Sequence, residues 1–263
     1  MEKAKKPQLK KIRELLKERS ARDKEGVFVA EGAKIVLDAL NKRRDVVSVF
    51  VSGRVVGAPM VREIISLCME NKVRLWRTAA AEFEKLSSLS NSQGILAVIK
   101  MPEKNSSLKG KLIVLCDGIQ DPGNLGTIIR TSAAFGISTV FVFGAAADIY
   151  NPKVVRSSSG TVMDVNPLSV KEEGLDELKT RGFYLVSGTS ERSGAKEMFA
   201  VELPESPVIL AFGSEGRGLS EAVTKRSDDV FYIPMAPAAE SLNVTAAAAI
   251  AIHYFSNKKG SNV

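Results

Sequence analysis

The chain has 263 residues, of which 44% are apolar and 25% charged, a composition that is ordinary for a soluble globular protein. The longest apolar run, Ala246 to Ile252, is far too short for a membrane span, and the charged N-terminus lacks the apolar segment of a signal peptide. Two cysteines, Cys68 and Cys116, are too few for a disulfide framework or a metal knuckle, so we expect a reducing, cytoplasmic location.

The net charge of +7 is unevenly distributed along the chain. Residues 1–104 hold 22 Lys and Arg against 13 Asp and Glu, a net charge of +9, whereas residues 105–263 hold 15 against 17, a net charge of −2. A basic surface attracts polyanions, so the N-terminal part predicts contact with RNA or DNA. The candidate contacts are Lys10, Lys11, Arg13, Lys17, Arg19 and Arg22. The alternative is a solvated helix face whose bases pair with the glutamates between them.

The first part of the chain predicts a small α/β domain over residues 1–104. It opens with a basic helix at 8–19, whose leucines and Ile12 lie on one stripe. Further helices are expected at 31–40, 59–70 and 79–86. Strands are expected at 27–30, 46–51, 73–76 and 94–100. A Ser/Asn-rich turn precedes the last strand, and the polar, breaker-rich segment 102–110 is interpreted as a linker.

A second α/β domain is expected over residues 105–263. Its strands are predicted at 112–116, 140–143, 182–186, 207–212 and 230–233. Its helices are predicted at 127–135 and 244–255. In parallel α/β sheets ligands bind beyond the carboxyl ends of strands, so the polar loops that follow these strands are the candidate sites.

The first candidate loop follows the strand at 112–116. Its glycines, Gly118 among them, permit tight turns and close approach of the backbone. Asn124 is a candidate cap for the next helix, and Arg130 lies one turn into that helix. The alternative is that Asn124 is a plain cap and Arg130 an ordinary exposed helix residue.

The second and third candidate loops follow the strands at 207–212 and 230–233. The glycine-rich second loop lacks the Lys-Ser/Thr ending of a P-loop, which disfavours a nucleotide-binding switch. Its Glu215 favours an uncharged or cationic ligand over a phosphate. In the third loop, Ser241 and Asn243 stand at a helix start, where they are either site residues or plain N-caps. His253, the single histidine, is expected to be a core or interface residue, and no cluster has metal-site spacing.

Together and in this order, the three segments resemble the signature motifs of the SpoU (TrmH-like) branch of the SPOUT RNA methyltransferases. Residues 121–130 are similar to motif one, 212–219 to motif two and 233–244 to motif three. Residues 151–160 also resemble a segment of the family. The first domain, with Phe28-Val-Ala-Glu-Gly32, looks like the ribosomal-protein-like (L30e/L7Ae-like) substrate-binding domain often fused ahead of the catalytic one.

The resemblance implies a deep trefoil knot in the C-terminal α/β domain, a homodimer packed through that domain, and S-adenosylmethionine as methyl donor without a metal. The implied reaction is 2′-O-ribose methylation of RNA. Ribosomal RNA is favoured over tRNA because a whole basic domain precedes the catalytic one. The remaining alternative is a non-catalytic RNA-binding or ribosome-assembly factor on the same scaffold.

Residue roles follow from motif position. The implied cofactor contacts are Gly213, Ile233 and Leu242. The implied catalytic residues are Arg130, Asn124, Glu215, Ser241 and Asn243. We interpret Arg130 as a clamp for phosphate and developing alkoxide charge rather than as a base, because a guanidinium stays protonated. Glu215 is expected to orient Arg130 or another donor.

Overall fold

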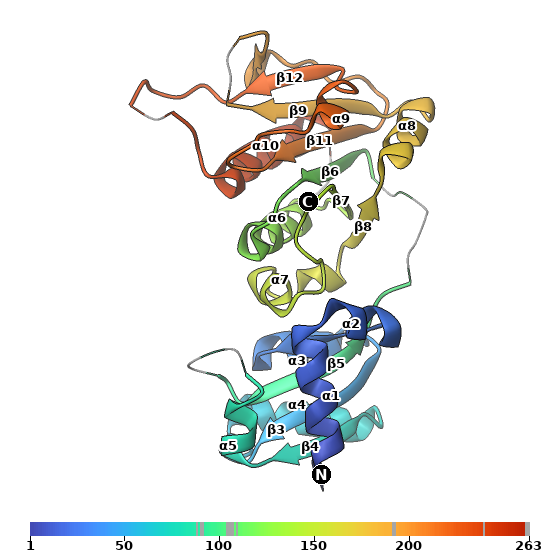
Figure 1. Cartoon of the computed structure of the whole chain (residues 1–263), viewed down its shortest axis with the longest axis vertical. Helices are drawn as coiled ribbons and strands as arrows, with labels where there is room; N and C mark the ends of the chain where they lie inside the picture. The colour runs from blue at the N-terminus through green and yellow to red at the C-terminus, as the bar shows by residue number, and fades with distance from the viewer. Residues whose placement is uncertain are drawn as a thin grey trace. The chain divides into compact units, whose positions relative to one another are not determined.

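A computed structural model describes residues 1–87, 89, 92–103, 108, 110–190, 193–238 and 240–260. The chain forms two compact units. Unit 1 comprises Met1–Glu103 and Tyr150–Met163, and unit 2 comprises Lys104–Ile149 and Asp164–Val263. Figure 1 follows the elements in chain order from blue to red. The predicted Ser/Asn-rich turn and linker fall partly outside the described residues.

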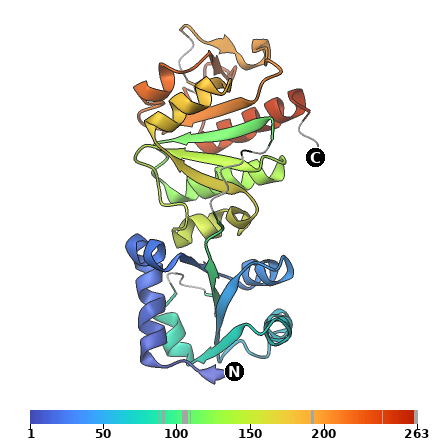
Figure 2. The same cartoon turned by 90° about the vertical axis from the view of Figure 1, so that its right-hand side faces the viewer.

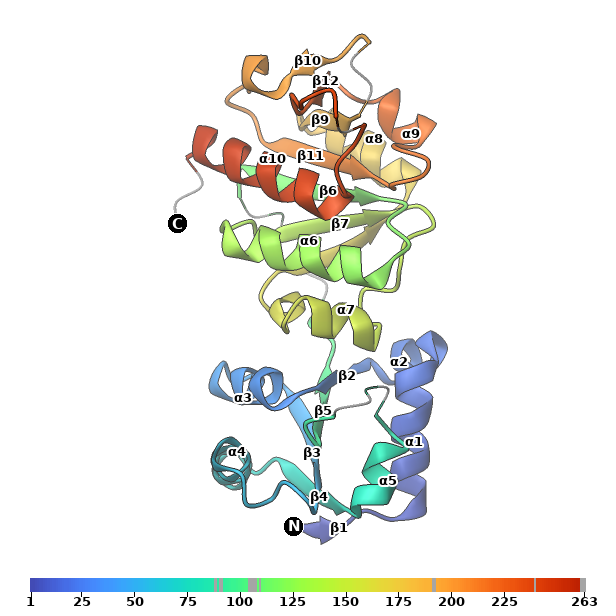
Figure 3. The same ribbon diagram turned by 90° about the vertical axis from the view of Figure 1, so that its left-hand side faces the viewer.

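Unit 1 is built on a mixed five-stranded sheet in the order β1-β4-β3-β5-β2. Its strands are β1 (Glu2–Lys3), β2 (Val27–Glu31), β3 (Val46–Ser52), β4 (Arg74–Thr78) and β5 (Ile95–Lys100). β5 runs antiparallel to both of its neighbours, and the other pairs are parallel. Helices α1 (Lys6–Lys17) and α5 (Ala80–Glu84) cover one face, and α3 (Ala33–Asn41) and α4 (Pro59–Glu70) cover the other (Figure 3).

The predicted basic helix is confirmed as α1, and its apolar stripe faces the core. Leu9, Ile12 and Leu15 are all less than 5% exposed and share a core cluster with Trp76 and Phe83. The helix ends at Lys17 because Glu18 adopts an extended conformation, and the chain then forms α2 (Arg19–Glu25). The hydrophobic period therefore orients the basic side chains of α1 away from the sheet.

The segment Tyr150–Met163 groups with unit 1, although the sequence assigned it to the C-terminal domain. It carries α7 (Pro152–Ser157), which packs on β2. The ring of Tyr150 stacks on the fully buried Phe28 with centroids 5.0 Å apart. Gly160 faces Ile35 so closely that an added Cβ would lie 2.8 Å from its Cγ2. These contacts join residues far apart in sequence, so no local pattern predicts them.

Unit 2 is built on seven parallel strands in the order β10-β12-β9-β11-β6-β7-β8. The strands are β6 (Leu112–Asp117), β7 (Thr139–Phe143), β8 (Asn166–Val170), β9 (Tyr184–Thr189), β10 (Lys196–Glu197), β11 (Val208–Gly213) and β12 (Asp229–Tyr232). Helices α6 (Pro122–Ala134) and α10 (Val244–Lys258) cover one face, and α8 (Glu172–Thr180) and α9 (Glu221–Thr224) the other (Figures 2 and 3). Because both faces are covered, the central strands are apolar along almost their whole length.

The predicted strands are confirmed with small shifts at their ends, and the prediction missed β8, β10, α7, α8 and α9. β8 (Asn166–Val170) contains a proline and sits at the sheet edge, where proline is tolerated, so its pattern is weak. No helix in the described part of the chain is long and apolar enough to cross a membrane. Cys68 and Cys116 are free and buried, and burial raises the pKa of both thiols to about 12.

Candidate functional site

A cavity of about 730 Å³ opens in unit 2 where three parallel strands end. Its walls come from the end of β9, the glycine-rich loop after β11, and the segment between β12 and α10. The volume lies in the range of pockets that hold drug-sized ligands. Six of the residues singled out in the sequence line it: Gly213, Glu215, Ile233, Ser241, Leu242 and Asn243.

The glycine-rich loop folds back on itself at the mouth of β11. Ser214 and Gly218 exchange two backbone hydrogen bonds, of 3.0 and 2.8 Å. A Cβ on Gly213 would lie 2.2 Å from the carbonyl carbon of Gly218, so no larger residue fits there without moving the loop. Gly218 itself has φ of +66°, a conformation that favours glycine. The glycines thus allow a tight turn whose residues form one wall of the cavity.

Glu215 joins the three candidate segments. Asn124 Nδ2 donates a hydrogen bond to Glu215 Oε1 at 3.1 Å, and Asn243 Nδ2 donates to the same oxygen. Asn243 also caps α10, since its Oδ1 accepts from the backbone N–H of Thr245 at 2.9 Å. Asn243 therefore serves both as the predicted N-cap and as a donor to Glu215. One carboxylate fixes the relative positions of the first turn of α6, the glycine loop and the start of α10.

Asn124 does not cap α6, so that prediction is wrong. The N-cap is Asp121, whose Oδ1 accepts from the backbone N–H of Asn124 at 2.9 Å, and Pro122 occupies the first helical position. An Asp-Pro pair is a typical helix start, and it was the overlooked signal. Because Asp121 supplies the capping acceptor, the Asn124 side chain is not needed as a cap and instead donates to Glu215.

Arg130 lies apart from the cavity. It is exposed on α6 and is not among the residues that line the cavity. Within the described ranges, no group forms a hydrogen bond or ion pair with its guanidinium. Glu215 binds two asparagines instead of orienting Arg130. The guanidinium is thus left available for a ligand outside this chain.

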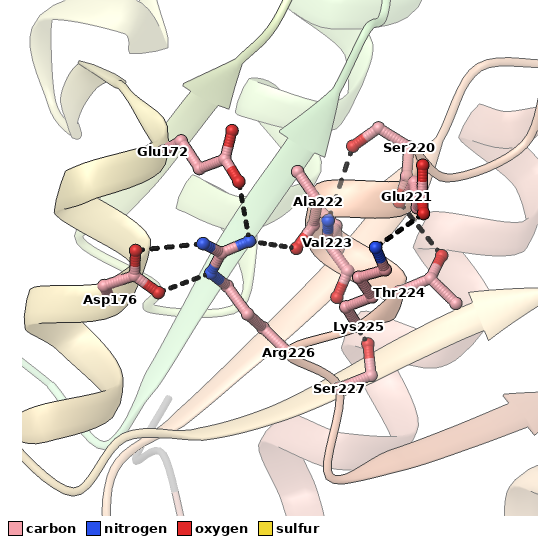
Figure 4. A network of polar contacts seen from close by, with 10 residues as sticks. All are labelled: Glu172, Asp176, Ser220, Glu221, Ala222, Val223, Thr224, Lys225, Arg226 and Ser227. Carbon is pink, nitrogen blue, oxygen red and sulfur yellow. Dashed lines mark hydrogen bonds and ion pairs between the residues drawn. The ribbon is translucent and has the colours of Figure 1, made fainter.

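Two supporting residues beneath the glycine loop were missed by the sequence analysis. Asp117, 3% exposed at the end of β6, accepts the backbone N–H of Ser220 at 2.6 Å. Arg226 binds both carboxylate oxygens of Asp176, at 2.7 and 2.9 Å, and donates to the carbonyl of Ala222 at 2.8 Å (Figure 4). The hydrogen bond with Asp176 raises the pKa of Arg226 and lowers that of the carboxyl. These contacts tie the chain after the loop to β6 and α8.

His253 is not a core residue. It is exposed on α10, where its ring meets Phe135 edge-on at 5.3 Å and lies beside Asn257. Its alternative interpretation as an interface residue stays a prediction. Across the described residues, no group of three or more His, Cys, Asp and Glu is arranged to hold a metal ion.

The six basic residues predicted to bind RNA fall into two sets. Four are engaged within unit 1: Lys10 pairs with Glu14 at 3.8 Å, Lys11 with Glu25 at 2.7 Å, Arg19 with Asp23 at 3.4 Å, and the buried Arg22 donates to the carbonyl of Leu15 at 2.6 Å. Arg22 is therefore a structural residue. Arg13 and Lys17 are exposed, and they have no hydrogen-bond or ion-pair partner in the part of the chain that the structure describes.

Comparison with known proteins agrees with this architecture. Residues 111–253 match the SpoU rRNA Methylase family, and residues 6–97 match the MRM3-like substrate binding domain. A 23S rRNA (guanosine(2553)-2'-O)-methyltransferase of Bacillus subtilis is 32% identical over 235 residues, which cover 89% of this chain and 90% of that protein. A 23S rRNA (uridine(2479)-2'-O)-methyltransferase of Streptomyces viridochromogenes is 30% identical over 249 residues, or 91% of this chain and 85% of that protein.

Solved structures give the same result. A structure described as a putative RNA methyltransferase of the TrmH family from Porphyromonas gingivalis is 30% identical with a TM-score of 0.80, covering 97% of this chain and 99% of that one. The SpoU methyltransferase AviRb of Streptomyces viridochromogenes, in complex with AdoMet, is 27% identical with a TM-score of 0.85, covering 98% of this chain and 100% of that one. The chain therefore belongs to the SpoU rRNA Methylase family and carries an MRM3-like substrate binding domain ahead of its methylase domain.

Proposed function

We propose that this protein is an S-adenosylmethionine-dependent 2′-O-ribose methyltransferase that acts on ribosomal RNA. The observation that carries the proposal is the junction at Glu215, where the three motif segments meet beside one cavity. Its relatives in Bacillus subtilis and Streptomyces viridochromogenes are named as 23S rRNA 2′-O-methyltransferases, and the similarity extends over both domains. A non-catalytic RNA-binding protein would need neither the cavity nor the junction.

The cavity fits S-adenosylmethionine in size and in chemistry. The tight turn at Gly213 exposes backbone groups, and Ile233 and Leu242 add apolar surface, so these three residues would hold the cofactor. The carboxylate of Glu215 on the cavity wall suits a cationic ligand. When bound, the cofactor supplies an electrophilic methyl group on a sulfonium. No metal is part of the proposal.

The remaining residues position the RNA. The guanidinium of Arg130 is a cationic donor, so it binds the phosphate next to the target ribose and stabilises negative charge that develops on the 2′-oxygen. Asn124 and Asn243 hold Glu215 and thereby the three loops. Ser241, exposed at the cavity, orients the ribose. Alignment of this kind accounts for much of the acceleration in a displacement between two bound groups.

Transfer of a labelled methyl group tests the proposal. Purified protein, labelled S-adenosylmethionine and ribosomal RNA from cells that lack the protein should give labelled RNA containing a single additional 2′-O-methyl nucleotide, mapped by mass spectrometry. Labelling of tRNA instead would overturn the ribosomal target. Failure to bind S-adenosylmethionine in titration calorimetry would favour the non-catalytic alternative.

We also propose that unit 2 contains a deep trefoil knot, that unit 1 has an L7Ae-like fold, and that the protein is a cytoplasmic homodimer packed through unit 2. Membership of the family supports the knot, and the central mixed sheet with helices on both faces supports the L7Ae-like fold. An exposed stripe on α10 that includes Ala246, Ile250 (42% exposed) and His253 supports the dimer. Light scattering should give twice the chain mass of 28.3 kDa, and Ile250→Asp should shift it towards the monomer.

A further inference from the structure

A second cavity, again of about 730 Å³, lies wholly within unit 1. Arg13 and Lys17 reach it from α1, Lys85 from the turn after α5, and Lys153 and Arg156 from α7. α1 and α5 lie side by side on one face of the sheet (Figures 2 and 3). None of the described residues that line this cavity is acidic or aromatic. We call these five cations and the space between them the basic pocket.

Three of the five cations of the basic pocket differ from the other basic residues near them. Arg13, Lys17 and Lys85 are exposed, and none of them has a hydrogen-bond or ion-pair partner among the residues that the structure describes. Nearby on α1 and α2, by contrast, Lys10, Lys11 and Arg19 are each paired with a carboxylate. Unpaired cations gathered around one cavity repel one another, so an anion that enters relieves this repulsion.

A buried carboxylate that does not itself line the cavity pairs with one cation of the basic pocket, Arg156. Glu31, whose side chain is 1% exposed, lies with its Oε2 3.7 Å from Arg156 Nη1. Its Oε1 accepts hydrogen bonds from the hydroxyls of Ser87 and Ser92, the latter at 2.9 Å. Neither Glu31 Oε2 nor Arg156 Nη1 has a hydrogen-bond partner in the described part of the chain. Glu31 therefore pairs with Arg156 through Nη1 alone, and Arg156 lines the cavity.

We propose that the basic pocket binds backbone phosphates of the RNA substrate. The proposal rests on the proposed function only in taking RNA as the ligand. Lysine and arginine side chains that converge from three elements match a phosphodiester, and arginine offers two parallel donors to it. Without an aromatic platform the basic pocket does not stack bases, so it contributes affinity and register but no sequence preference.

Salt dependence of RNA binding tests the proposal on the full-length chain. The pocket variant carries Arg13→Gln, Lys17→Gln and Lys85→Gln. The matched control carries Lys10→Gln, Lys11→Gln and Arg19→Gln, which removes the same charge from paired residues nearby. A fluorescein-labelled RNA hairpin is titrated with each protein at several salt concentrations, and log Kobs is plotted against log salt concentration.

The pocket variant is expected to flatten the slope by about 2, since each lost phosphate contact removes about 0.7 to 0.9. The control should change it by less than half as much. Equal changes in the two triple variants would overturn the proposal, because net charge alone would then explain binding. Should the triple variant unfold in a thermal melt, Lys17→Gln and Lys85→Gln are measured singly, each with an expected change of about 0.7 to 0.9.

Methyl transfer by the wild-type protein is measured in parallel, so that the two proposals can fail separately. If the pocket variant loses more salt slope than the control but the wild-type protein transfers no methyl group, RNA binding by the basic pocket is supported and the methyltransferase proposal is overturned. If the wild-type protein transfers methyl groups but both triple variants have the same salt slope, the methyltransferase proposal is supported and the basic-pocket proposal is overturned.

Discussion

The two cavities of this protein are built on opposite principles. In unit 2 three polar side chains beside the cavity are already bonded to one another, with Glu215 accepting from Asn124 and Asn243. In unit 1 the basic pocket keeps Arg13 and Lys17 without a partner within the described chain. A site that must align two small reacting groups gains from a rigid framework, whereas a site for a long polyanion gains from free charge. Cofactor binding should accordingly be far less sensitive to salt than RNA binding.

Arg130 lies outside this framework: it is exposed on α6 and has no hydrogen-bond or ion-pair partner within the described chain, and its removal should have the largest effect. Arg130→Ala is expected to lower the methyl-transfer rate about 100- to 1,000-fold, since a donor aimed at developing charge is lost. The dissociation constant for S-adenosylmethionine should change less than about threefold, a difference well under 1.4 kcal/mol. Single-turnover assays and titration calorimetry measure the two quantities. Lys225→Ala, which removes an exposed cation paired with Glu221, is the control. If Arg130→Ala has a normal methyl-transfer rate, Arg130 has no role in catalysis.

A single added Cβ atom at Gly213 should disrupt the glycine-rich loop of unit 2. Gly213→Ala places a Cβ 2.2 Å from Gly218, so the loop must open, and the affinity for S-adenosylmethionine should fall about 100-fold or more, equivalent to about 2.7 kcal/mol. Gly216→Ala is the matched control, because a Cβ there meets nothing within 4 Å. Calorimetry measures the affinity of both variants for S-adenosylmethionine. It separates the steric clash at Gly213 from a general stiffening of the loop by alanine. Equal affinities would show that the close approach does not matter for the cofactor.

The shared acceptor offers a third test of the same framework. Glu215→Ala removes the two exposed hydrogen bonds that join Asn124 and Asn243 to one carboxylate, and a hydrogen bond typically contributes about 0.5 to 1.5 kcal/mol net. We expect methyl transfer to fall about 10- to 100-fold, with little change in the salt slope for RNA. Glu215→Gln retains an acceptor oxygen and should recover part of the activity. A change in the salt slope instead would mean that Glu215 acts on RNA binding.

The smallest effect is expected at Arg226, which anchors the chain after the glycine loop. Its hydrogen bonds lower the pKa of Asp176, so this ion pair stabilises the fold above the ordinary carboxyl value of 3.8 and is lost as the pH falls below it. Arg226→Ala should therefore lower the thermal midpoint at pH 7, and the difference from wild type should shrink below about pH 4. Melting curves across pH 3 to 7 check this. A difference that is constant with pH would assign the effect to packing.

Much of the fold could be predicted from the sequence. The start of α6 and the edge strand β8 show why some of it could not. The apolar stripe of α1 repeats with the helical period, and the buried strand β6 (Leu112–Asp117) is a continuous apolar run, so both are visible in the local sequence. The start of α6 was predicted too late because Asp121 was not considered as its cap. The edge strand β8 (Asn166–Val170) was missed because it is only half buried and therefore lacks a continuous apolar pattern.

The candidate site was predicted in part. The loops that line the cavity were identified because glycines and polar residues follow apolar strands. Asp117 and Arg226 were not found, since a single carboxylate or guanidinium carries no local signal of its partner. The same holds for the basic residues of α1, because no local pattern separates Arg13 from Lys10.

The sequence by itself determined the α/β pattern, the uneven charge and the three loops, because each depends on neighbours within a few residues. Only the tertiary structure decided which groups meet. Glu215 takes its two hydrogen bonds from residues 91 and 28 positions away, and Tyr150–Met163 joins unit 1 through contacts with β2. Partners at such separations are chosen by the packing of whole elements, which buries apolar faces first and brings polar side chains together as a consequence.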